Sequence, residues 1–544
     1  MNGIVHVPVP ANEPVLDHAP GSAERGALLA ELDRLGAQTH ELPMTIGGER
    51  RIAGGEPFSL VQPHDRHTGL GTVHEATTDD VKQAIAAALE ARHDWSRTSF
   101  ETRSAIFLKA ADLLAGPWRA RLNAATMLGQ SKTAHQAEID SACELIDFWR
   151  FNVHFARQLL DEQPLSVDGV WNRVDYRPLE GFVCAITPFN FTSIAANLPT
   201  APALMGNTVV WKPSPTQQLS AQLTMELLEA AGLPPGVVNL VTGRGHALSE
   251  VGITDPDLAG IHFTGSSRTF RHLWRSVAEN LERYRTFPRV VGETGGKNFV
   301  LAHPSADSDV LRTALVRGAF EYQGQKCSSA SRLYVAASTW RTLESDLVAE
   351  ADALPMGDVR DLTNFLGAVI DATAYQRLAD VVTRADADPL LHRLTNRRPD
   401  DRDGWFVPPT IYRSDDPTHD MFVTEHFGPI LAVWVYDDDR FDDVIGLVDR
   451  TSPYGLTGAI VAGDRVALEH AARELRDAAG NLYLNDKPTG AVVGQQPFGG
   501  ARASGTNDKA GTLGHLLRWV SPRTIKETFV PPTEYRYPYM TPEE

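Results

Sequence analysis

The sequence predicts an α/β protein with a doubly wound parallel sheet, a second α/β unit and a small extended arm. Short apolar runs alternate with helical segments at residues 182–186, 209–211, 237–241 and 260–263, and again at 299–301, 331–335, 430–435, 456–461 and 480–484. Parallel strands that helices cover on both faces have this composition. Residues 170–177 instead alternate apolar with polar side chains, which is typical of a half-exposed antiparallel strand.

The segments around these runs complete the predicted architecture. Residues 1–60 hold one short helical patch and several polar turns, so we expect a wrapping arm rather than a domain. Helical spacing begins at Thr78, and residues 134–160 predict one long helix in which Cys143 packs. Cys184 lies inside the first apolar run and is expected in the core. Residues 521–544, rich in proline and aromatic side chains, predict an extended arm that reaches a neighbouring subunit.

The composition excludes several classes of protein. The 544 residues carry a net charge of −18, which argues against nucleic acid or an anionic membrane as the main partner. No apolar stretch approaches the roughly 20 residues of a membrane helix. Three cysteines cannot form a disulfide framework. The N-terminus resembles neither a secretory signal nor an organelle import segment, so we expect a cytoplasmic protein.

The stretch 320–333 holds the most chemically suggestive cysteine, Cys327. Its neighbours are small or polar, whereas a cysteine that only packs usually lies in an apolar run. Helical spacing over residues 309–322 predicts that the thiol follows a buried helix, which Gly324 helps to end. The adjacent Lys326 is expected to favour the reactive thiolate. On this stretch alone, an incidental free thiol is the simpler interpretation.

Polar residues follow the apolar runs, where a doubly wound sheet binds its ligands. The amide of Asn190 could donate to a developing oxyanion. Lys212 and Ser214 suit ribose or phosphate oxygens, and Gly243 lies in a turn that lacks the third glycine of the common dinucleotide fingerprint. The turn at 264–267 opens a helix whose N-terminus could bind a pyrophosphate. Taken singly, these features are equally typical of turns, solvated loops and helix caps.

Two carboxylates are candidates for catalysis or binding. Glu293 follows an apolar pair and precedes two glycines, and a carboxyl at the mouth of an apolar pocket could act as a general base. Glu425 precedes another turn. Either acid alone is more often a surface charge. No metal site is indicated, because His64 and His67 lie in a polar loop without matched partners and are best interpreted as solvated.

Together these motifs match one family in order and spacing. The chain resembles the aldehyde dehydrogenase superfamily over nearly its whole length. The separation between Glu293 and Cys327 also fits that family. The matching pieces are PFNF at 188–191, KPS at 212–214, FTGS at 263–266, ETGGK at 293–297, GQKC at 324–327, EHFGP at 425–429 and PFGG at 497–500.

Within the superfamily the chain resembles the branch that oxidises L-glutamate γ-semialdehyde, the open form of 1-pyrroline-5-carboxylate, to L-glutamate in proline breakdown. The most specific pieces are NEPVL at 12–16, TFPR at 286–289, NDK at 485–487 and GQQPFGGARASGTN at 494–507. The resemblance implies an NAD-binding domain over 1–160 and 180–295, a catalytic domain over 296–518, and an oligomerisation arm of 161–179 and 519–544. The chain leaves no room for a proline dehydrogenase domain, so the single-activity form is expected.

The resemblance also implies a role for each site residue. Cys327 should attack the aldehyde carbon, Asn190 and the Cys327 N–H should hold the oxyanion, and Glu293 should activate the water that releases the acid. The residues expected to hold NAD are Lys212, Ser214, Gly243, Gly265, Ser266, Glu425 and Phe427. Those expected around the substrate are Phe191 and Phe498 on its aliphatic part, and Ser328, Gly490 and Ala491 on its α-carboxylate.

Two positions depart from the family pattern. Relatives often carry Ser where this chain has Ala491, so one hydroxyl contact to the carboxylate is missing and a modest loss of affinity is expected. Pro215 stands where many members carry an acid that accepts the adenosine ribose hydroxyls. The absence of that acid weakens the expectation of strict NAD use, so NAD is favoured and NADP is an alternative.

Other functions and partners stay open at this point. A dehydrogenase for another acidic semialdehyde, such as succinate semialdehyde, would need a different carboxylate site. A cysteine-dependent acyl transferase conflicts with the cofactor loops and with Glu293. A catalytically silent binding or structural protein of this fold conflicts with the joint presence of Cys327, Glu293 and Asn190. We expect a small-molecule substrate, a homodimer or larger homo-oligomer, and functional coupling to a separate proline dehydrogenase.

Overall fold

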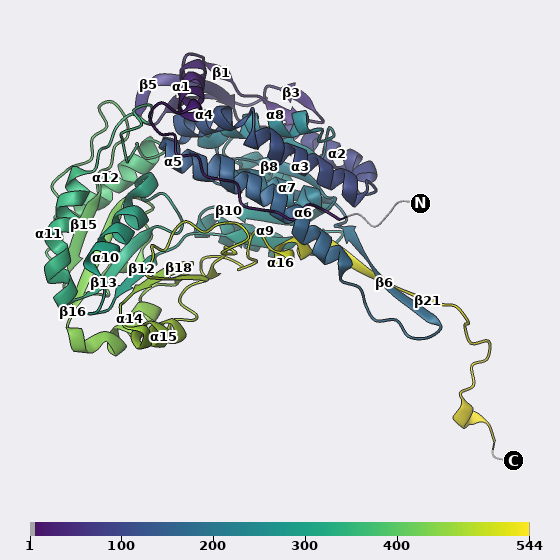
Figure 1. Ribbon diagram of the computed structural model, residues 1–544. Coiled ribbons are helices and arrows are strands. Elements are labelled where there is room, and N and C mark those ends of the chain that lie inside the picture. Colours follow the sequence, from purple (N-terminus) through teal and green to yellow (C-terminus); the bar gives the residue numbers. More distant parts are fainter. Residues whose placement is uncertain (1–5, 543–544) are drawn as a thin grey trace.

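A computed structural model describes residues 6–542, which form two α/β units and a projecting two-stranded arm (Figure 1). The first unit contains a seven-stranded sheet in the order β11-β10-β7-β8-β9-β2-β3. Its parallel strands are β7 (Phe182–Ile186), β8 (Thr208–Lys212), β9 (Val238–Leu240), β10 (Leu258–Thr264) and β11 (Arg289–Glu293). The doubly wound sheet predicted from the apolar runs is therefore confirmed.

The second unit repeats this plan with a seven-stranded sheet in the order β14-β15-β16-β13-β12-β18-β19. All neighbouring strands are parallel except β14, which pairs antiparallel with β15. The apolar runs predicted five of its strands but not β14 and β15, which are short and carry polar residues. The strands are β12 (Asn298–Ala302), β13 (Ala330–Ala336), β14 (Leu391–Arg393), β15 (Thr410–Ser414), β16 (Ile430–Tyr436), β18 (Thr457–Val461) and β19 (Asn481–Leu484).

The prediction of a wrapping arm is wrong for most of residues 1–60. Strand β2 (Met44–Ile46) is buried and pairs antiparallel with β9, and β3 (Glu49–Arg51) forms the edge of the same sheet. Helix α1 (Ala23–Gly36) packs on α4 (Arg119–Gln130). A three-residue strand is too short to show a period in the sequence. A separate small sheet contains β1 (His40–Glu41), β4 (Pro57–Gln62) and β5 (Asp65–His74).

Helices surround both sheets (Figure 1). In the first unit they are α2 (Thr78–Trp95), α3 (Phe100–Ala115), α5 (Ala134–Ala137), α6 (Leu145–Asp161), α7 (Thr192–Leu204), α8 (Gln218–Ala231) and α9 (Ser267–Glu279), with short turns η2 (Pro215–Gln217) and η3 (Leu248–Gly252). In the second they are α10 (Ser308–Leu315), α11 (Ala337–Ala353), α12 (Ala372–Asp386), α13 (Asp420–Val423), α14 (Phe441–Thr451) and α15 (Arg465–Glu474). Helix α16 (Leu513–Leu517) packs on α6 of the first unit. Smaller pieces are η6 (Asp438–Arg440), β17 (Tyr454–Gly455), β20 (Ala501–Arg502) and η7 (Pro538–Met540).

The helix predicted over 134–160 is interrupted by a π-helical segment, η1 (Glu138–Glu144), between α5 and α6. In a π-helix each backbone hydrogen bond spans one residue more than in an α-helix, and such segments often occur at functional sites. Here the polar residues of η1 turn inward: Asp140 and Glu138 are fully buried. Periodicity alone does not reveal such a segment, because its side chains still fit a helical pattern.

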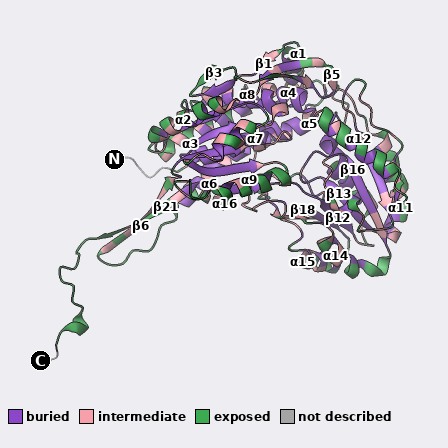
Figure 2. Cartoon of the chain, turned by 180° about the vertical axis from the view of Figure 1, so that it is seen from behind, coloured by how far each residue is buried: buried purple, intermediate pink, exposed green. Residues whose placement is uncertain are grey.

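The cores of the two units lie at their sheets (Figure 2). The inner strands β7, β8, β12 and β18 are almost wholly buried, as their unbroken apolar composition requires. Cys184 has no exposed surface and packs in this core, as predicted. Cys143 is also buried, in η1. Among residues 6–542, no helix is both long enough and apolar enough to cross a membrane.

The arm is a long antiparallel ribbon that stands clear of both units (Figure 1). Strand β6 (Val170–Pro178) pairs along its whole length with β21 (Val520–Thr528). The antiparallel strand predicted from alternation is confirmed. Beyond β21 the chain continues away from the body and exposes large apolar side chains: Phe529, Val530, Tyr535, Tyr537 and Tyr539.

The interpretation of His64 as a solvated histidine is wrong. Its side chain is 3% exposed, and its Nδ1 lies 3.2 Å from Ser131 Oγ. Burial lowers the pKa of His64 to about 4, which keeps the ring neutral. His67 is exposed, as predicted, with its Nε2 3.0 Å from the Arg402 carbonyl. Residues distant in the sequence cover the loop of His64, so the sequence around His64 does not predict that the side chain is buried.

Candidate active site

Cys327 is presented by a sharply turned backbone. Helix α10 leads into η4 (Val316–Phe320) and η5 (Glu321–Gly324), where Tyr322, Gln323 and Gly324 have φ of 52°, 55° and 64°. A Cβ at Gly324 would lie 2.3 Å from the Gly428 carbonyl oxygen, so only glycine fits there. Asn298 Nδ2 donates to the Cys327 carbonyl at 2.8 Å and fixes the thiol-bearing residue.

The thiol itself is only partly exposed. Burial raises the pKa of Cys327, and the nearby carboxyls of Glu293 and Glu425 raise it further. The prediction that Lys326 favours the thiolate is wrong, because the Lys326 ammonium donates to Glu321 Oε2 at 3.0 Å in a buried ion pair. The thiol therefore needs a base to take its proton when it reacts.

Asn190 lies beside this turn and is 4% exposed. Its Nδ2 donates to the Gln325 carbonyl at 3.0 Å, two residues before the thiol. An amide nitrogen carries two N–H groups, so the second remains to stabilise an oxyanion. The hydrogen bond to Gln325 holds the amide in place before substrate arrives.

Glu293 ends strand β11, as expected for a residue at the carboxyl edge of the first sheet. Its Oε2 accepts a hydrogen bond from the Gly500 N–H at 2.9 Å. Desolvation raises the pKa of Glu293 well above its ordinary value, although the Gly500 N–H lowers it in part. A carboxyl of raised pKa in a dry site is suited to exchange a proton near neutral pH.

Glu425 approaches the same region from the loop before β16. Its Oε1 accepts from the Gly296 N–H at 2.8 Å, and burial raises its pKa to about 7. Phe427 has φ of 53°. The centre of its ring lies 5.8 Å from the centre of the Phe189 ring, and the two rings are nearly perpendicular. The predicted cofactor residues of the second unit thus lie on a turn held against the Gly295-Gly296 pair.

The remaining predicted cofactor residues lie at the carboxyl edge of the first sheet. Lys212 is 7% exposed, and its ammonium donates to the Gly243 carbonyl at 3.4 Å, its one hydrogen bond within residues 6–542. Burial lowers its pKa to about 8. Ser266 caps α9 by accepting from the Thr269 N–H at 3.1 Å. Ser214, 3.3 Å from the Thr216 hydroxyl, lies just beyond β8.

This edge fits a dinucleotide. A buried ammonium with one weak carbonyl partner is suited to ribose or phosphate oxygens, and the N-terminus of the 13-residue α9 favours a pyrophosphate. Two glycines of this edge leave no room for a side chain. A Cβ at Gly243 would lie 2.2 Å from Glu75 Oε2, and one at Gly265 would lie 2.7 Å from the Phe263 ring.

The predicted substrate residues surround one cavity of about 910 Å³. Cys327, Phe191, Ser328, Gly490, Ala491 and Phe498 all line it. Gly490 has φ of 88°, which a residue with a Cβ adopts at a cost. The thiol, two aromatic rings and a turn of backbone N–H groups are therefore brought together from four separate stretches of the chain.

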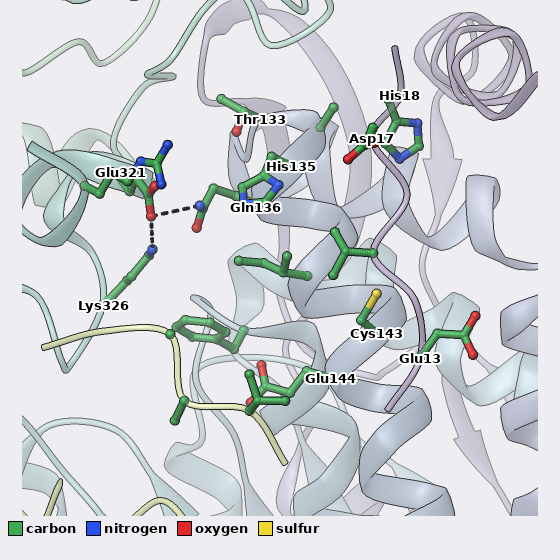
Figure 3. A pocket seen from close by; sticks show the side chains of 18 of the residues that line it. Glu13, Asp17, His18, Thr133, His135, Gln136, Cys143, Glu144, Glu321 and Lys326 are labelled. Atoms are coloured by element: carbon green, nitrogen blue, oxygen red, sulfur yellow. Dashed lines mark hydrogen bonds and ion pairs between the residues drawn. The ribbon is translucent and has the colours of Figure 1, made fainter. Parts of the chain in front are cut away.

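Several charged residues that the sequence analysis did not select also line this cavity (Figure 3). Glu144 accepts from Ser193 Oγ at 3.0 Å, and burial raises its pKa to about 8. Glu321 lies between Gln136 and Lys326. The sequence around Glu144 and Glu321 does not distinguish them from surface acids. Each belongs to a helical segment, and only the tertiary fold shows that this segment faces the cavity.

A buried cation also supports the Phe191 ring. The Lys132 ammonium lies 4.0 Å from the centre of that ring and 4.5 Å from the Tyr322 ring. It pairs with Asp140 at 2.7 Å, and Asp140 also accepts from the backbone N–H of Thr192. Cation–π contact with a desolvated ammonium stabilises the ring position. Phe191 is thus held rigidly at the cavity wall.

Comparison with known proteins places this geometry in a family. Residues 52–525 match the Aldehyde dehydrogenase family. The chain belongs to the aldehyde dehydrogenase family. The mouse protein named "Delta-1-pyrroline-5-carboxylate dehydrogenase, mitochondrial" is 48% identical over 530 residues, which cover 97% of this chain and 94% of the relative. The predicted superfamily and its fold are confirmed.

Solved structures agree with this family. The crystal structure of the Delta-pyrroline-5-carboxylate dehydrogenase from Mycobacterium tuberculosis bound with NAD is 58% identical, with a TM-score of 0.97 over 99% of this chain and 100% of that one. Proline utilization A from Bdellovibrio bacteriovorus is 30% identical, with a TM-score of 0.90 over 96% of this chain and 54% of that one. The aldehyde dehydrogenase fold of both units is thus shared along nearly the whole chain.

Proposed function

We propose that this aldehyde dehydrogenase oxidises L-glutamate γ-semialdehyde, the open form of 1-pyrroline-5-carboxylate, to L-glutamate with NAD. The observation that carries the proposal is the single cavity in which Cys327 faces two aromatic rings and the Gly490–Ala491 turn. An aldehyde with an aliphatic stem and a carboxylate at its far end matches this arrangement. The relatives at 48% and 58% identity carry the name of this activity.

The reaction follows from the positions of the side chains. The Cys327 thiol loses its proton to water, and the sulfur bonds to the aldehyde carbon. The carbonyl oxygen becomes an oxyanion, which the Asn190 amide and the Cys327 N–H stabilise. NAD, held by Lys212, Ser214, Ser266 and Glu425, supplies the acceptor for the hydride that leaves this carbon. The acyl group then remains on Cys327 as a thioester.

Hydrolysis completes the cycle. Glu293 takes a proton from a water molecule whose oxygen attacks the thioester carbon, and the C–S bond breaks to release L-glutamate and the thiol. The closeness of Glu293 to Gly499 and Gly500 holds its carboxyl at the wall of the site. Ser328 and the N–H groups of Gly490 and Ala491 keep the α-carboxylate in place throughout.

The substrate is tested by comparing nicotinamide reduction with pyrroline-5-carboxylate and with succinate semialdehyde, each with NAD and with NADP. We expect a kcat/KM at least about tenfold higher for the pyrroline compound, because the carboxylate of succinate semialdehyde lies one carbon nearer to its aldehyde and should miss one or two hydrogen bonds of the carboxylate turn. NAD should be preferred despite Pro215. Equal or higher activity on succinate semialdehyde would overturn the assignment of the carboxylate turn while leaving the thioester chemistry intact.

We further propose that the arm joins copies of this chain into a homodimer or larger homo-oligomer. Its apolar side chains Phe529, Val530, Tyr535, Tyr537 and Tyr539 are 61–83% exposed, and apolar patches of this kind mark interfaces. Light scattering should give a mass of at least two chains for the intact protein and one chain for a variant that ends after Thr528. A monomeric intact protein would contradict the proposal.

Two further proposals concern the setting of the enzyme. All three cysteines are free thiols and Cys327 must stay reduced to react, which supports a cytoplasmic location. Transfer of pyrroline-5-carboxylate from a separate proline dehydrogenase is consistent with the match to proline utilization A. A coupled assay in which mixing the two enzymes leaves the transfer rate at the diffusional value would rule out that coupling.

A further inference from the structure

The N-terminal segment NEPVL and its neighbours, residues 12–18, take no part in the reaction described above, yet they cross the mouth of the substrate cavity. Figure 3 shows Glu13, Asp17 and His18 on this segment, beside the cavity. We call residues 12–18 the strap. The strap has no regular secondary structure, so side-chain contacts must hold it.

The strap is docked on the η1–α6 region by a dense set of polar contacts. The Glu13 N–H donates to Asp147 Oδ1 at 2.7 Å, and the Leu16 N–H donates to Glu138 Oε1 at 2.9 Å. The Glu13 carboxylate pairs with Arg119 at 2.6 Å and with Arg150 at 2.7 Å. These contacts give the strap a fixed position against rigid helices.

Asn12 extends from the strap to the opposite wall. Its Nδ2 donates both to Asp147 Oδ2 at 2.8 Å and to the Val493 carbonyl at 2.8 Å. Its Oδ1 accepts from Gln495 Nε2 at 2.9 Å. The amide therefore uses both donors and its acceptor to join α6 to the turn that carries Gly490 and Ala491.

The hydrogen bonds of Asn12 matter because the turn formed by residues 488–496 has few other restraints. Residues 488–496 have no regular secondary structure, and their internal hydrogen bonds close only on Val492 and Gln496. Within residues 6–542, every hydrogen bond between residues 488–496 and the rest of the chain is made by Asn12. Buried Val493 adds apolar packing, which restrains position less directionally than hydrogen bonds do.

We propose that Asn12 is a positioning residue for substrate recognition: it holds the 488–496 turn so that the N–H groups of Gly490 and Ala491 face the α-carboxylate of the substrate. The inference rests on the proposed function and deepens it, because it assigns carboxylate recognition partly to the N-terminal strap. The hydrogen bonds of Asn12 go to Asp147, Val493 and Gln495 rather than to Cys327, so Asn12 should act on substrate affinity rather than on the chemical step.

The test compares Asn12→Ala with Glu13→Gln. Glu13→Gln removes the ion pairs that dock the strap but leaves the Asn12 link to the turn intact. For Asn12→Ala we expect the KM for pyrroline-5-carboxylate to rise about tenfold, which corresponds to about 1.4 kcal/mol, the size of one or two hydrogen bonds. The kcat, the KM for NAD and kcat/KM on propanal, which has no carboxylate, should stay within about twofold. Gln495→Ala, which removes one of the two links, should raise the same KM less.

A second measurement is independent of activity. Hydrogen exchange of the peptide covering 488–496 should be faster in Asn12→Ala than in wild type or Glu13→Gln, because only Asn12→Ala frees the turn. Unchanged exchange in that peptide, or equal losses on propanal and on the carboxylate substrate, would overturn the proposal. If wild type did not oxidise pyrroline-5-carboxylate, the proposed substrate would fail, and the exchange result would still decide whether Asn12 holds the turn.

Discussion

Replacing Cys327 with alanine should reduce the rate of nicotinamide reduction by more than about 10⁴-fold, because it removes the sulfur on which the thioester forms. The residue lies where the backbone turns sharply after η5, and its carbonyl is fixed by Asn298, so a neighbouring hydroxyl cannot move into its place. Steady-state turnover with saturating pyrroline-5-carboxylate and NAD measures the effect.

The matched control is a second thiol of the same cavity. Cys143→Ala removes a cavity-lining thiol whose pKa burial raises to about 12, and it should retain most of the activity. Both variants should unfold at nearly the wild-type temperature. Substantial turnover in Cys327→Ala, or equal losses in the two variants, would refute the assignment of the nucleophile.

Replacing Glu293 with glutamine should separate the two halves of the reaction. Loss of the general base should lower the steady-state rate about 10²- to 10⁴-fold. Glutamine keeps the acceptor for the Gly500 N–H, so the site should keep its shape. Because Glu293 acts on the water of the hydrolysis step, stopped-flow mixing should still show one rapid equivalent of reduced nicotinamide per active site, followed by very slow turnover as the thioester accumulates.

The same residue predicts a pH dependence. Desolvation holds the pKa of Glu293 well above the ordinary carboxyl value, and only the ionised carboxylate acts as a base. The wild-type steady-state rate should therefore rise with pH until Glu293 is ionised, and the Glu293→Gln variant should lose that rise. A wild-type burst absent from the variant would instead indicate that Glu293 is needed to form the thioester.

Prediction from sequence worked best where the signal is local. Most parallel strands of both sheets were predicted because unbroken apolar runs mark strands buried on two faces, although β11 and β15 were not. The arm was predicted from its alternation. The short strands β2 and β3 were missed because three residues show no period. The π segment η1 was missed because it keeps the pattern of a helix.

The site shows the same division. Motif order located Cys327, Asn190 and Ser328, which the structure places at or beside the cavity. The prediction about Lys326 failed because sequence proximity suggested that its charge would act on the thiol, whereas folding pairs it with Glu321. The NEPVL motif supports the family resemblance, but the sequence does not predict its contact with residues 488–496, since Asn12 and Val493 are 481 residues apart.

The sequence by itself determined most of the buried parallel strands, the two α/β units, the family and the residues that can do the chemistry, because periodicity and motif spacing are properties of neighbouring residues. Tertiary structure decided which charges are buried, which acids face the cavity and what holds the carboxylate turn. Those properties depend on desolvation and on contacts between distant segments, and both arise only when the chain is folded. The raised pKa of Glu293 and the reach of Asn12 across the cavity mouth are the clearest cases.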